Sequence, residues 1–378
     1  MIKTNYYQDL TKMNTFGMKV KARCFMEYDS VADLVDIEFA ELARPVLHIG
    51  GGSNLLFTDD FKGTVLHSKI DFIEILDDCH LDRAEGMEKS ETPVLVSVGA
   101  GVVFDDFCDW AAKEGLWGAE NLSYIPGEVG ASAVQNIGAY GVEVKDIIYK
   151  VYCYDTIEEE FVCFDVDECE YGYRDSYFKR PEVKGRYIVT HVVFALSRTP
   201  DPHLEYGHLK EAVCCHSERG EEALTPLTIR KVIIKIRKEK LPEPSVMGSA
   251  GSFFKNPVIS AEHFSRIEAA AKAELGSDYK VPHYIVDSVI SSACTPATLS
   301  MTSKAEKSVK VPAAWLIEQC GWKGKRSGGA AVYDKQPLVI VNYTGEAFPE
   351  EIIGLERRII DSVKRKFEIE LHPEVEHI

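Results

Sequence analysis

The chain lacks several features that would assign it quickly to a class of protein. Its ten cysteines form no CxxC pair and no metal-like spacing with histidine, so we expect reduced, unpaired thiols and no metal site. No segment approaches the roughly 18 consecutive apolar residues of a membrane span, and the start has no apolar run behind positive charge. We therefore expect a cytoplasmic protein without a membrane partner.

Positive charge is also scarce. Lysine and arginine number 43 against 60 aspartates and glutamates, which gives a formal net charge of −17. A field of this sign repels phosphate backbones, so nucleic acid is not an expected partner. Any phosphate-bearing ligand must be held by backbone donors and a few well-placed cations.

The remaining composition is that of a globular protein. Of the 378 residues, 45% are hydrophobic and 27% are charged, enough for two or three domains. We find no internal repeat, and the hydrophobic patterns predict an α+β fold. A loop is predicted over 282–310, and the proline-rich segment 241–244 is expected to mark a domain boundary. The periodicity predicts strands at 45–49, 55–57, 94–98, 151–164, 188–196 and 338–341, and helices at 105–114, 226–240, 312–320 and 350–367.

Two segments are rich in small residues. Gly50–Asn54 follows an apolar strand and is either a tight turn or a nest of backbone N–H groups for a phosphate. It is not a GxGxxG fingerprint, because Leu55 replaces the third glycine. The second segment, 121–141, would also let a ligand approach the backbone closely. Two such segments are what one large cofactor would need.

Three polar residues lie in settings that allow catalysis as well as structural roles. Ser252 follows a flexible glycine-rich stretch, and because no GxSxG elbow is present it is either a turn residue or a proton donor. Arg174 lies among aromatic residues and could stabilise a carboxylate or form a salt bridge with Asp175 or another acid. Glu374 lies in a terminal segment that either frays or docks through its apolar neighbours.

Taken together, these motifs resemble the UDP-N-acetylenolpyruvoylglucosamine reductase family of flavoproteins. Several unrelated motifs in family order are far more specific than any one alone. The resemblance covers nearly the whole chain and is carried by Asn14–Gly17, Gly50–Leu56, Ile125–Gly127, Gln135–Gly141, Tyr173–Ser176, Gly251–Pro257, Ala314–Glu318, Gly328–Ala331 and Pro373–Val375.

The resemblance implies a two-subdomain FAD-binding fold of the vanillyl-alcohol-oxidase type plus a C-terminal α+β substrate-binding domain. The implied ranges are 1–75 and 76–225 for the FAD-binding subdomains, with the tail 368–378 returning to the first, and 226–367 for the substrate-binding domain. The implied reaction is NADPH-dependent reduction, through FAD, of an enolpyruvyl ether on a UDP-sugar in peptidoglycan precursor synthesis. No obligate protein partner is evident.

Site residues carry over from the family by position. Arg174, Ser252 and Glu374 match its catalytic residues, with Ser252 as proton donor. Those matching cofactor-binding positions are Gly50, Gly51, Gly52, Ser53, Asn54, Gly127, Gly130, Ser132, Gln135, Asn136 and Gly138. Those expected to bind substrate are Tyr206, Arg237, Lys240 and Asn256, and the Tyr206–Gly207 loop resembles the subclass in which a tyrosine covers the substrate.

Some features depart from the family, and two other functions stay open. Segments 211–224 and 283–309 differ from what we expect, and Ala131 stands where serine is common. An oxygen-using oxidase of the same fold often attaches flavin through a histidine beside the glycine loop, where this chain has Ser53–Asn54. A non-catalytic flavin or nucleotide-sugar sensor would not need the serine, arginine and glutamate that are all present.

Overall fold

The computed structural model describes residues 1–76, 92–218, 224–286 and 308–378. They form two compact units, one of residues 1–245 with 377–378 and the other of 246–376. The boundary between Ser245 and Val246 follows the proline-rich segment directly. The expected three domains, with limits near residues 75 and 225, stay a prediction.

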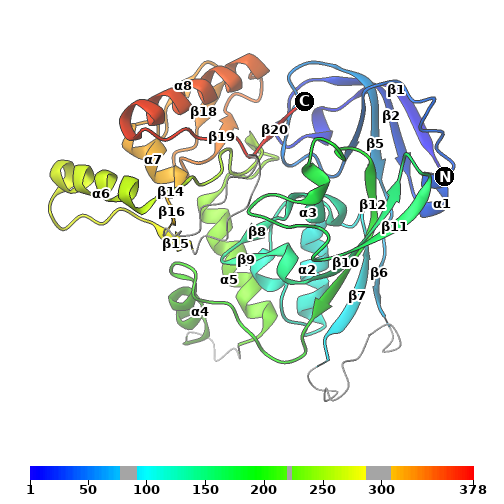
Figure 1. Cartoon of the computed structure of the whole chain (residues 1–378), viewed down its shortest axis with the longest axis horizontal. Helices are drawn as coiled ribbons and strands as arrows, with labels where there is room; N and C mark the ends of the chain where they lie inside the picture. Colours follow the sequence, from blue (N-terminus) through cyan, green and yellow to red (C-terminus); the bar gives the residue numbers. More distant parts are fainter. Residues whose placement is uncertain (77–91, 219–223, 287–307) are drawn as a thin grey trace, which may run out of the picture. The chain divides into compact units, whose positions relative to one another are not determined.

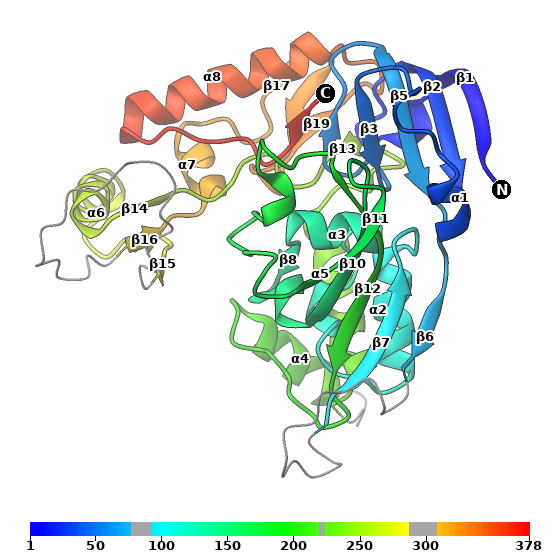
Figure 2. The same ribbon diagram turned by 45° about the vertical axis from the view of Figure 1, so that its right-hand side comes forward.

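The first unit contains a four-stranded sheet that brings the first glycine segment to one strand end. Its strands β1 (Lys3–Asp9), β2 (Lys21–Tyr28), β5 (Phe61–Ser68) and β3 (Val46–Ile49) lie in the order β1-β2-β5-β3. Figure 2 shows these strands side by side in blue. β1 is antiparallel to β2, whereas β5 runs parallel to both β2 and β3. The predicted strand, glycine turn and second strand are therefore found, since β3 leads through Gly50–Asn54 into β4 (Leu55–Leu56).

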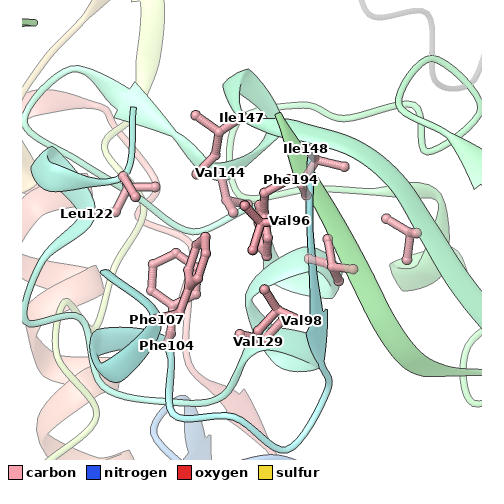
Figure 3. Close-up of a cluster of buried hydrophobic side chains, with 14 of the residues drawn as sticks. Val96, Val98, Phe104, Phe107, Leu122, Val129, Val144, Ile147, Ile148 and Phe194 are labelled. Atoms are coloured by element: carbon pink, nitrogen blue, oxygen red, sulfur yellow. The ribbon is translucent and has the colours of Figure 1, made fainter. Parts of the chain in front are cut away.

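A second sheet in this unit has the order β11-β10-β12-β7-β6 and is antiparallel throughout. Its strands are β6 (Ile73–Ile75), β7 (Val94–Gly99), β10 (Ile148–Asp155), β11 (Glu160–Asp165) and β12 (Tyr187–Leu196). Helices α2 (Phe104–Lys113) and α3 (Val129–Gln135) bury their apolar side chains against it (Figure 1). Figure 3 shows Phe104 and Phe107 beside Phe194 of β12, and the Phe107 and Phe194 rings stack with centroids 4.5 Å apart.

The helix predicted after Thr225 is α5 (Pro226–Lys240), and its start has the expected chemistry. The Thr225 hydroxyl accepts from the Thr228 N–H, and the Thr228 hydroxyl accepts from the Thr225 N–H. Arg230 is buried on this helix and forms ion pairs with Asp105 and Asp109 of α2. Such pairing is needed for a buried guanidinium, and it fixes α5 against helix α2.

The described residues of the second unit form two small sheets and three helices. One sheet has the order β13-β19-β18-β17, the other β14-β16-β15. Their bounds are β13 (Gly248–Ser249), β17 (Arg326–Ser327), β18 (Ala330–Val332), β19 (Ile340–Asn342), β14 (Val258–Ser260), β15 (Tyr284–Val286) and β16 (Ser308–Lys310). The helices are α6 (Ala261–Leu275), α7 (Ala313–Gln319) and α8 (Pro349–Phe367).

The expectation of one loop over 282–310 was wrong at both ends. Tyr284–Val286 and Ser308–Lys310 form β15 and β16, which pair with each other, and β16 also pairs with β14. The polar composition concealed three-residue strands that backbone pairing stabilises. The rest of that segment, 287–307, lies outside the described residues.

Helix α4 (Leu209–Glu218) covers much of the segment expected to depart from the family. The short elements complete the chain: α1 (Val31–Val35), β8 (Gly138–Ala139), β9 (Val142–Glu143), β20 (Glu376–His377) and the 3-10 helices η1 (Thr11–Met13), η3 (Glu120–Leu122), η4 (Val144–Asp146) and η5 (Tyr177–Lys179). Within the described ranges, no helix has both the length and the apolar character to cross a membrane.

Candidate functional site

The two small-residue segments meet in the first unit. A Cβ added at Gly51 would lie only 3.3 Å from the Gly127 Cα. The two backbones therefore pass each other with no side chain between them at this point. The Ser53 hydroxyl donates to the Pro126 carbonyl oxygen over 3.0 Å and links the segments directly. Gly127 adopts φ +118°, a conformation that favours glycine. The sequence predicted two close-approach segments, and the structure brings them together.

Gly52 has a structural reason of its own to be glycine. It adopts φ +60°, and an added Cβ would lie 2.0 Å from the Met13 carbonyl oxygen. Its own carbonyl accepts from the Thr15 N–H at 3.2 Å. The Asn14–Gly17 motif therefore packs against the glycine turn. Packing thus explains why these two motifs occur together in the chain.

The polar side chains of the second segment are engaged by protein partners. The Ser132 hydroxyl donates to the Val129 carbonyl at 2.7 Å. The buried Asn136 amide donates to the Gly172 carbonyl at 2.7 Å and to the Glu143 carboxylate at 3.1 Å. A ligand on this segment would therefore meet mainly backbone groups and the two glycines, Gly130 and Gly138.

Gln135 and Asn54 connect the two segments a second time, since the Asn54 amide donates to the Gln135 oxygen at 3.4 Å. The same oxygen accepts from the Lys179 ammonium at 2.9 Å. Lys179 was not predicted from the sequence, because nothing in its local pattern separates it from a surface lysine. It places a cation beside the second segment of a strongly acidic protein.

Arg174 lies against the same segment. Its guanidinium donates to the Gly138 carbonyl at 2.6 Å and to the Asn136 carbonyl at 3.3 Å. Its acidic partner is Glu143, at 3.9 Å, and its own backbone has φ +55°. Left-handed backbone in a non-glycine residue is uncommon and concentrates at functional sites. The cation is thus fixed beside the bare backbone by two carbonyls.

The predicted substrate residues of the first unit form a second group. The exposed Tyr206 ring meets the Tyr140 ring edge to face, with centroids 6.1 Å apart. The Arg237 Nε donates to the Tyr124 carbonyl at 3.1 Å, and burial lowers the pKa of the guanidinium. The Tyr140 hydroxyl contacts Arg237, and burial raises the pKa of that phenol. Lys240 is exposed at the end of α5.

In the second unit, backbone pairing brings Ser252 and Glu374 close in the fold. The Glu374 N–H donates to the Phe253 carbonyl at 2.8 Å, and the Lys255 N–H donates to the His372 carbonyl at 2.9 Å. The terminal segment is therefore docked at Glu374, not frayed. Asn256, on the same strand-like segment, accepts from the Ala313 N–H at 2.9 Å and so also fixes the start of α7.

A histidine that the sequence did not single out contacts a residue that lies against the glycine segments. His67 of β5 is buried between two carboxylates, 3.1 Å from Glu27 and 2.9 Å from Glu128. Glu128 follows Gly127 directly, and its carboxylate lies 3.3 Å from the Cβ position of Gly50. The three residues are far apart in the sequence, so no local pattern could have indicated the cluster.

Comparison with known proteins assigns this arrangement to a class. A model of the FAD-binding domain matches residues 22–156, which include both glycine segments up to β10. The first unit therefore carries the FAD-binding domain of a flavoprotein. A second model, described as the C-terminal domain of UDP-N-acetylenolpyruvoylglucosamine reductase, matches residues 243–378.

Curated relatives fix the family. A UDP-N-acetylenolpyruvoylglucosamine reductase of Bacteroides fragilis (strain YCH46) is 45% identical over 370 residues, 98% of each chain. One from Porphyromonas gingivalis (strain ATCC 33277) is 41% identical over 374 residues, 98% of this chain and 97% of that one. The chain belongs to the UDP-N-acetylenolpyruvoylglucosamine reductase family.

A solved structure shows the same fold. The crystal structure of UDP-N-acetylenolpyruvylglucosamine reductase (MurB) from Thermus caldophilus matches with a TM-score of 0.60 and 21% identity. The match covers 100% of this chain and 98% of that one. The α+β architecture expected from the sequence is confirmed.

Proposed function

We propose that the chain uses NADPH and FAD to reduce the enolpyruvyl group of UDP-N-acetylglucosamine enolpyruvate, giving UDP-N-acetylmuramate for peptidoglycan. The family supports the reaction. The observation that carries the proposal is the meeting of the two bare glycine segments with Arg174 fixed against one of them. The substrates are soluble nucleotides, which supports the expected cytoplasmic location.

The residues present fit FAD. Where Gly51 passes Gly127, a side chain would push the two segments apart. Backbone N–H groups of such glycine turns attract anions such as a pyrophosphate. Arg174 and Lys179 supply local positive charge that the net charge of −17 does not. We propose that Gly50–Asn54 and the segment from Gly127 to Gly138 hold the cofactor. Bound flavin would supply the hydride transfer from NADPH to the vinyl group.

We propose that three residues of the chain stabilise the negative charge that develops on the substrate and supply the proton that completes the reaction. When hydride adds to the distal vinyl carbon, negative charge spreads through the other vinyl carbon into the substrate carboxylate. We propose that Arg174 and Glu374 stabilise this charge, with Glu374 carrying or sharing a proton as the enol forms. The Ser252 hydroxyl then protonates the carbon that bears the ether oxygen.

Four residues are proposed to bind the substrate. Tyr206 would cover it, and Arg237, Lys240 and Asn256 would contact its diphosphate. The half-buried Arg237 supports this role, because a guanidinium in a poorly hydrated place favours a bidentate anion.

An anaerobic experiment tests the proposal. The purified protein should be yellow, bleach on addition of NADPH, and regain its colour when the enolpyruvyl substrate is added. A sensor would not turn over the substrate, and an oxidase would regain colour only with oxygen. Either result would reject the proposed reaction.

A further inference from the structure

The segment that carries Tyr206 has little backbone structure to hold it. Residues 198–208 form neither helix nor strand and are mostly exposed. Among the described residues, no backbone-to-backbone hydrogen bond involves 200–205. A segment of this kind needs another anchor if a side chain on it is to keep one position.

A buried asparagine supplies that anchor. Asn121 of η3 is 1% exposed, and its amide nitrogen donates to the His203 carbonyl at 2.7 Å and to the Tyr140 carbonyl at 3.0 Å. Since both carbonyls need a donor, the nitrogen must face them, and the Asn121 oxygen has no hydrogen-bond partner in the described chain. One amide thus joins two segments that are 19 and 82 residues away along the chain.

Asn121 bonds His203, three residues before Tyr206, and also bonds Tyr140, whose ring contacts that of Tyr206. The Tyr140 and Tyr206 rings meet edge to face at 84°, and the Tyr206 Cβ lies 3.5 Å from the Cβ position of Gly141. Tyr140 also contacts Arg237 through its hydroxyl. Asn121 therefore bonds Tyr140, which in turn contacts both Tyr206 and Arg237.

We infer that Asn121 is a positioning residue for Tyr206 and, through it, for binding of the UDP-sugar. The inference rests on the proposed function for the role of Tyr206. The two hydrogen bonds of Asn121 go to His203 and Tyr140, which lie outside the ranges proposed to hold the cofactor, Gly50–Asn54 and Gly127–Gly138. Its loss should therefore leave hydride transfer from NADPH intact while weakening capture of the second substrate.

The test compares two buried asparagines in the holoenzyme. Asn121→Ala removes both donors, and Asn121→Asp places an acceptor against the two carbonyls in nearly the same volume. The matched control is Asn14→Ala. Asn14 is 4% exposed and likewise donates to two carbonyls, those of Leu10 and Met18, neither of which belongs to the segment that carries Tyr206.

For Asn121→Ala we expect the KM of the UDP-sugar to rise about tenfold, the amount that loss of one or two buried hydrogen bonds predicts. The rate of flavin reduction by NADPH should change by less than about twofold, since Tyr206 plays no part in that step. Asn14→Ala should not raise the KM selectively. An unchanged KM in Asn121→Ala, or equal damage to both half-reactions, would overturn the inference.

A double-mutant cycle separates positioning from general damage. If Asn121 acts through Tyr206, then Asn121→Ala combined with Tyr206→Ala should raise the KM no further than Tyr206→Ala alone. Additive effects would show that Asn121 acts elsewhere, and the inference would fall.

Limited proteolysis gives a readout that needs no substrate. In Asn121→Ala a protease of broad specificity should cut within 200–207 faster than in the wild type, while Asn14→Ala leaves the rate of cutting there unchanged. An unchanged rate in Asn121→Ala would reject the anchor. Wild-type turnover in the same assays tests the proposed function separately, so the two failures can be told apart.

Discussion

The proposed site residues are held in different ways in the two units. In the first unit, side chains fix the backbone: Ser53 bonds Pro126, and Arg174 bonds two carbonyls of the second glycine segment. In the second, Ser252 and Glu374 are placed by pairing of backbone groups between two short segments. The difference indicates that substitution of a side chain should disturb the backbone more in the first unit's glycine segments than around Ser252 and Glu374. Substitutions in the two units should therefore have separable effects.

The largest expected effect is at Ser252. Ser252→Ala should slow reoxidation of the flavin by the enolpyruvyl substrate by about 10²–10⁴, the usual loss for one positioned general acid. Reduction by NADPH should stay near wild type, because no proton from this hydroxyl is needed there. Stopped-flow flavin absorbance follows each half-reaction.

Ser252→Cys provides the control for this change. It restores an acidic proton on a longer bond and should recover part of the rate. If Ser252→Ala slows both half-reactions alike, or neither, then Ser252 is a structural turn residue and the separation between the units is lost.

In the first unit, His67→Ala should destabilise the fold. Removing the imidazole leaves Glu27 and Glu128 buried or half-buried without their shared partner, a change that typically costs about 3 kcal/mol or more. Urea denaturation of variant and wild type measures the loss. His67→Gln, which can still donate to one carboxylate, should lose less, and equal stability of the wild type and His67→Ala would show that the cluster is dispensable.

Gly51→Val tests the glycine segments themselves. Because the Cβ alone would lie 3.3 Å from Gly127, the branched side chain should cost about 1–3 kcal/mol of FAD affinity, roughly 10- to 100-fold. Fluorescence titration of the apoprotein with FAD measures it. Gly354→Ala is the matched control, since no atom lies within 4 Å of its Cβ position, and it should bind FAD normally.

The stability of the first unit should also depend on pH, through His48. Burial, with a smaller contribution from the charge of His67, lowers the pKa of His48 from 6.5 to about 3. The unfolded chain therefore binds a proton between pH 6.5 and about 3 that the folded chain does not, and stability falls as pH falls through this window, by up to about 1.4 kcal/mol per unit.

His48→Gln should flatten this slope while keeping an acceptor for the Tyr28 hydroxyl, which lies 2.6 Å from the His48 ring nitrogen. Denaturation midpoints at pH 7 and pH 5 check the expectation. A slope in the variant equal to that of the wild type would assign the acid sensitivity to other groups.

The smallest effect is expected at the exposed residues that we propose to bind the substrate. Tyr206→Phe and Lys240→Ala should each raise the substrate KM by about two- to tenfold, the value of one hydrogen bond. Flavin reduction by NADPH should be unchanged. Steady-state kinetics at fixed NADPH give the KM. An effect on cofactor affinity instead would argue that these side chains bind the cofactor and not the UDP-sugar.

The sequence predicted those parts of the fold that local patterns determine. Helices α2, α5 and α8 begin and end within a residue or two of their predicted bounds, since caps and 3.6-residue periodicity are local. Helix α6 was missed although Phe264, Ile267 and Ala271 mark its buried face. Its many charged and alanine residues weaken the apolar pattern.

The site was predictable only where the residues form motifs. The two glycine segments could be found from their composition, whereas their direct contact at Gly51 and Gly127 is seen only in the folded chain. The partners of His67 and of Asn121 could not be found, because each of these side chains bonds positions 19 to 82 residues away. Only the folded chain shows which carbonyl or carboxylate lies opposite.

Left-handed backbone recurs in the first unit's site at residues that are not glycine. Asn136, Tyr140 and Arg174 adopt φ of 45°, 50° and 55°, and Tyr124 adopts 62°. Each costs the folded chain of order 1 kcal/mol that glycine would not. A laboratory selection for heat resistance alone should therefore favour glycine at these positions, and a variant with glycine in place of Arg174 would lose the guanidinium that we propose for catalysis.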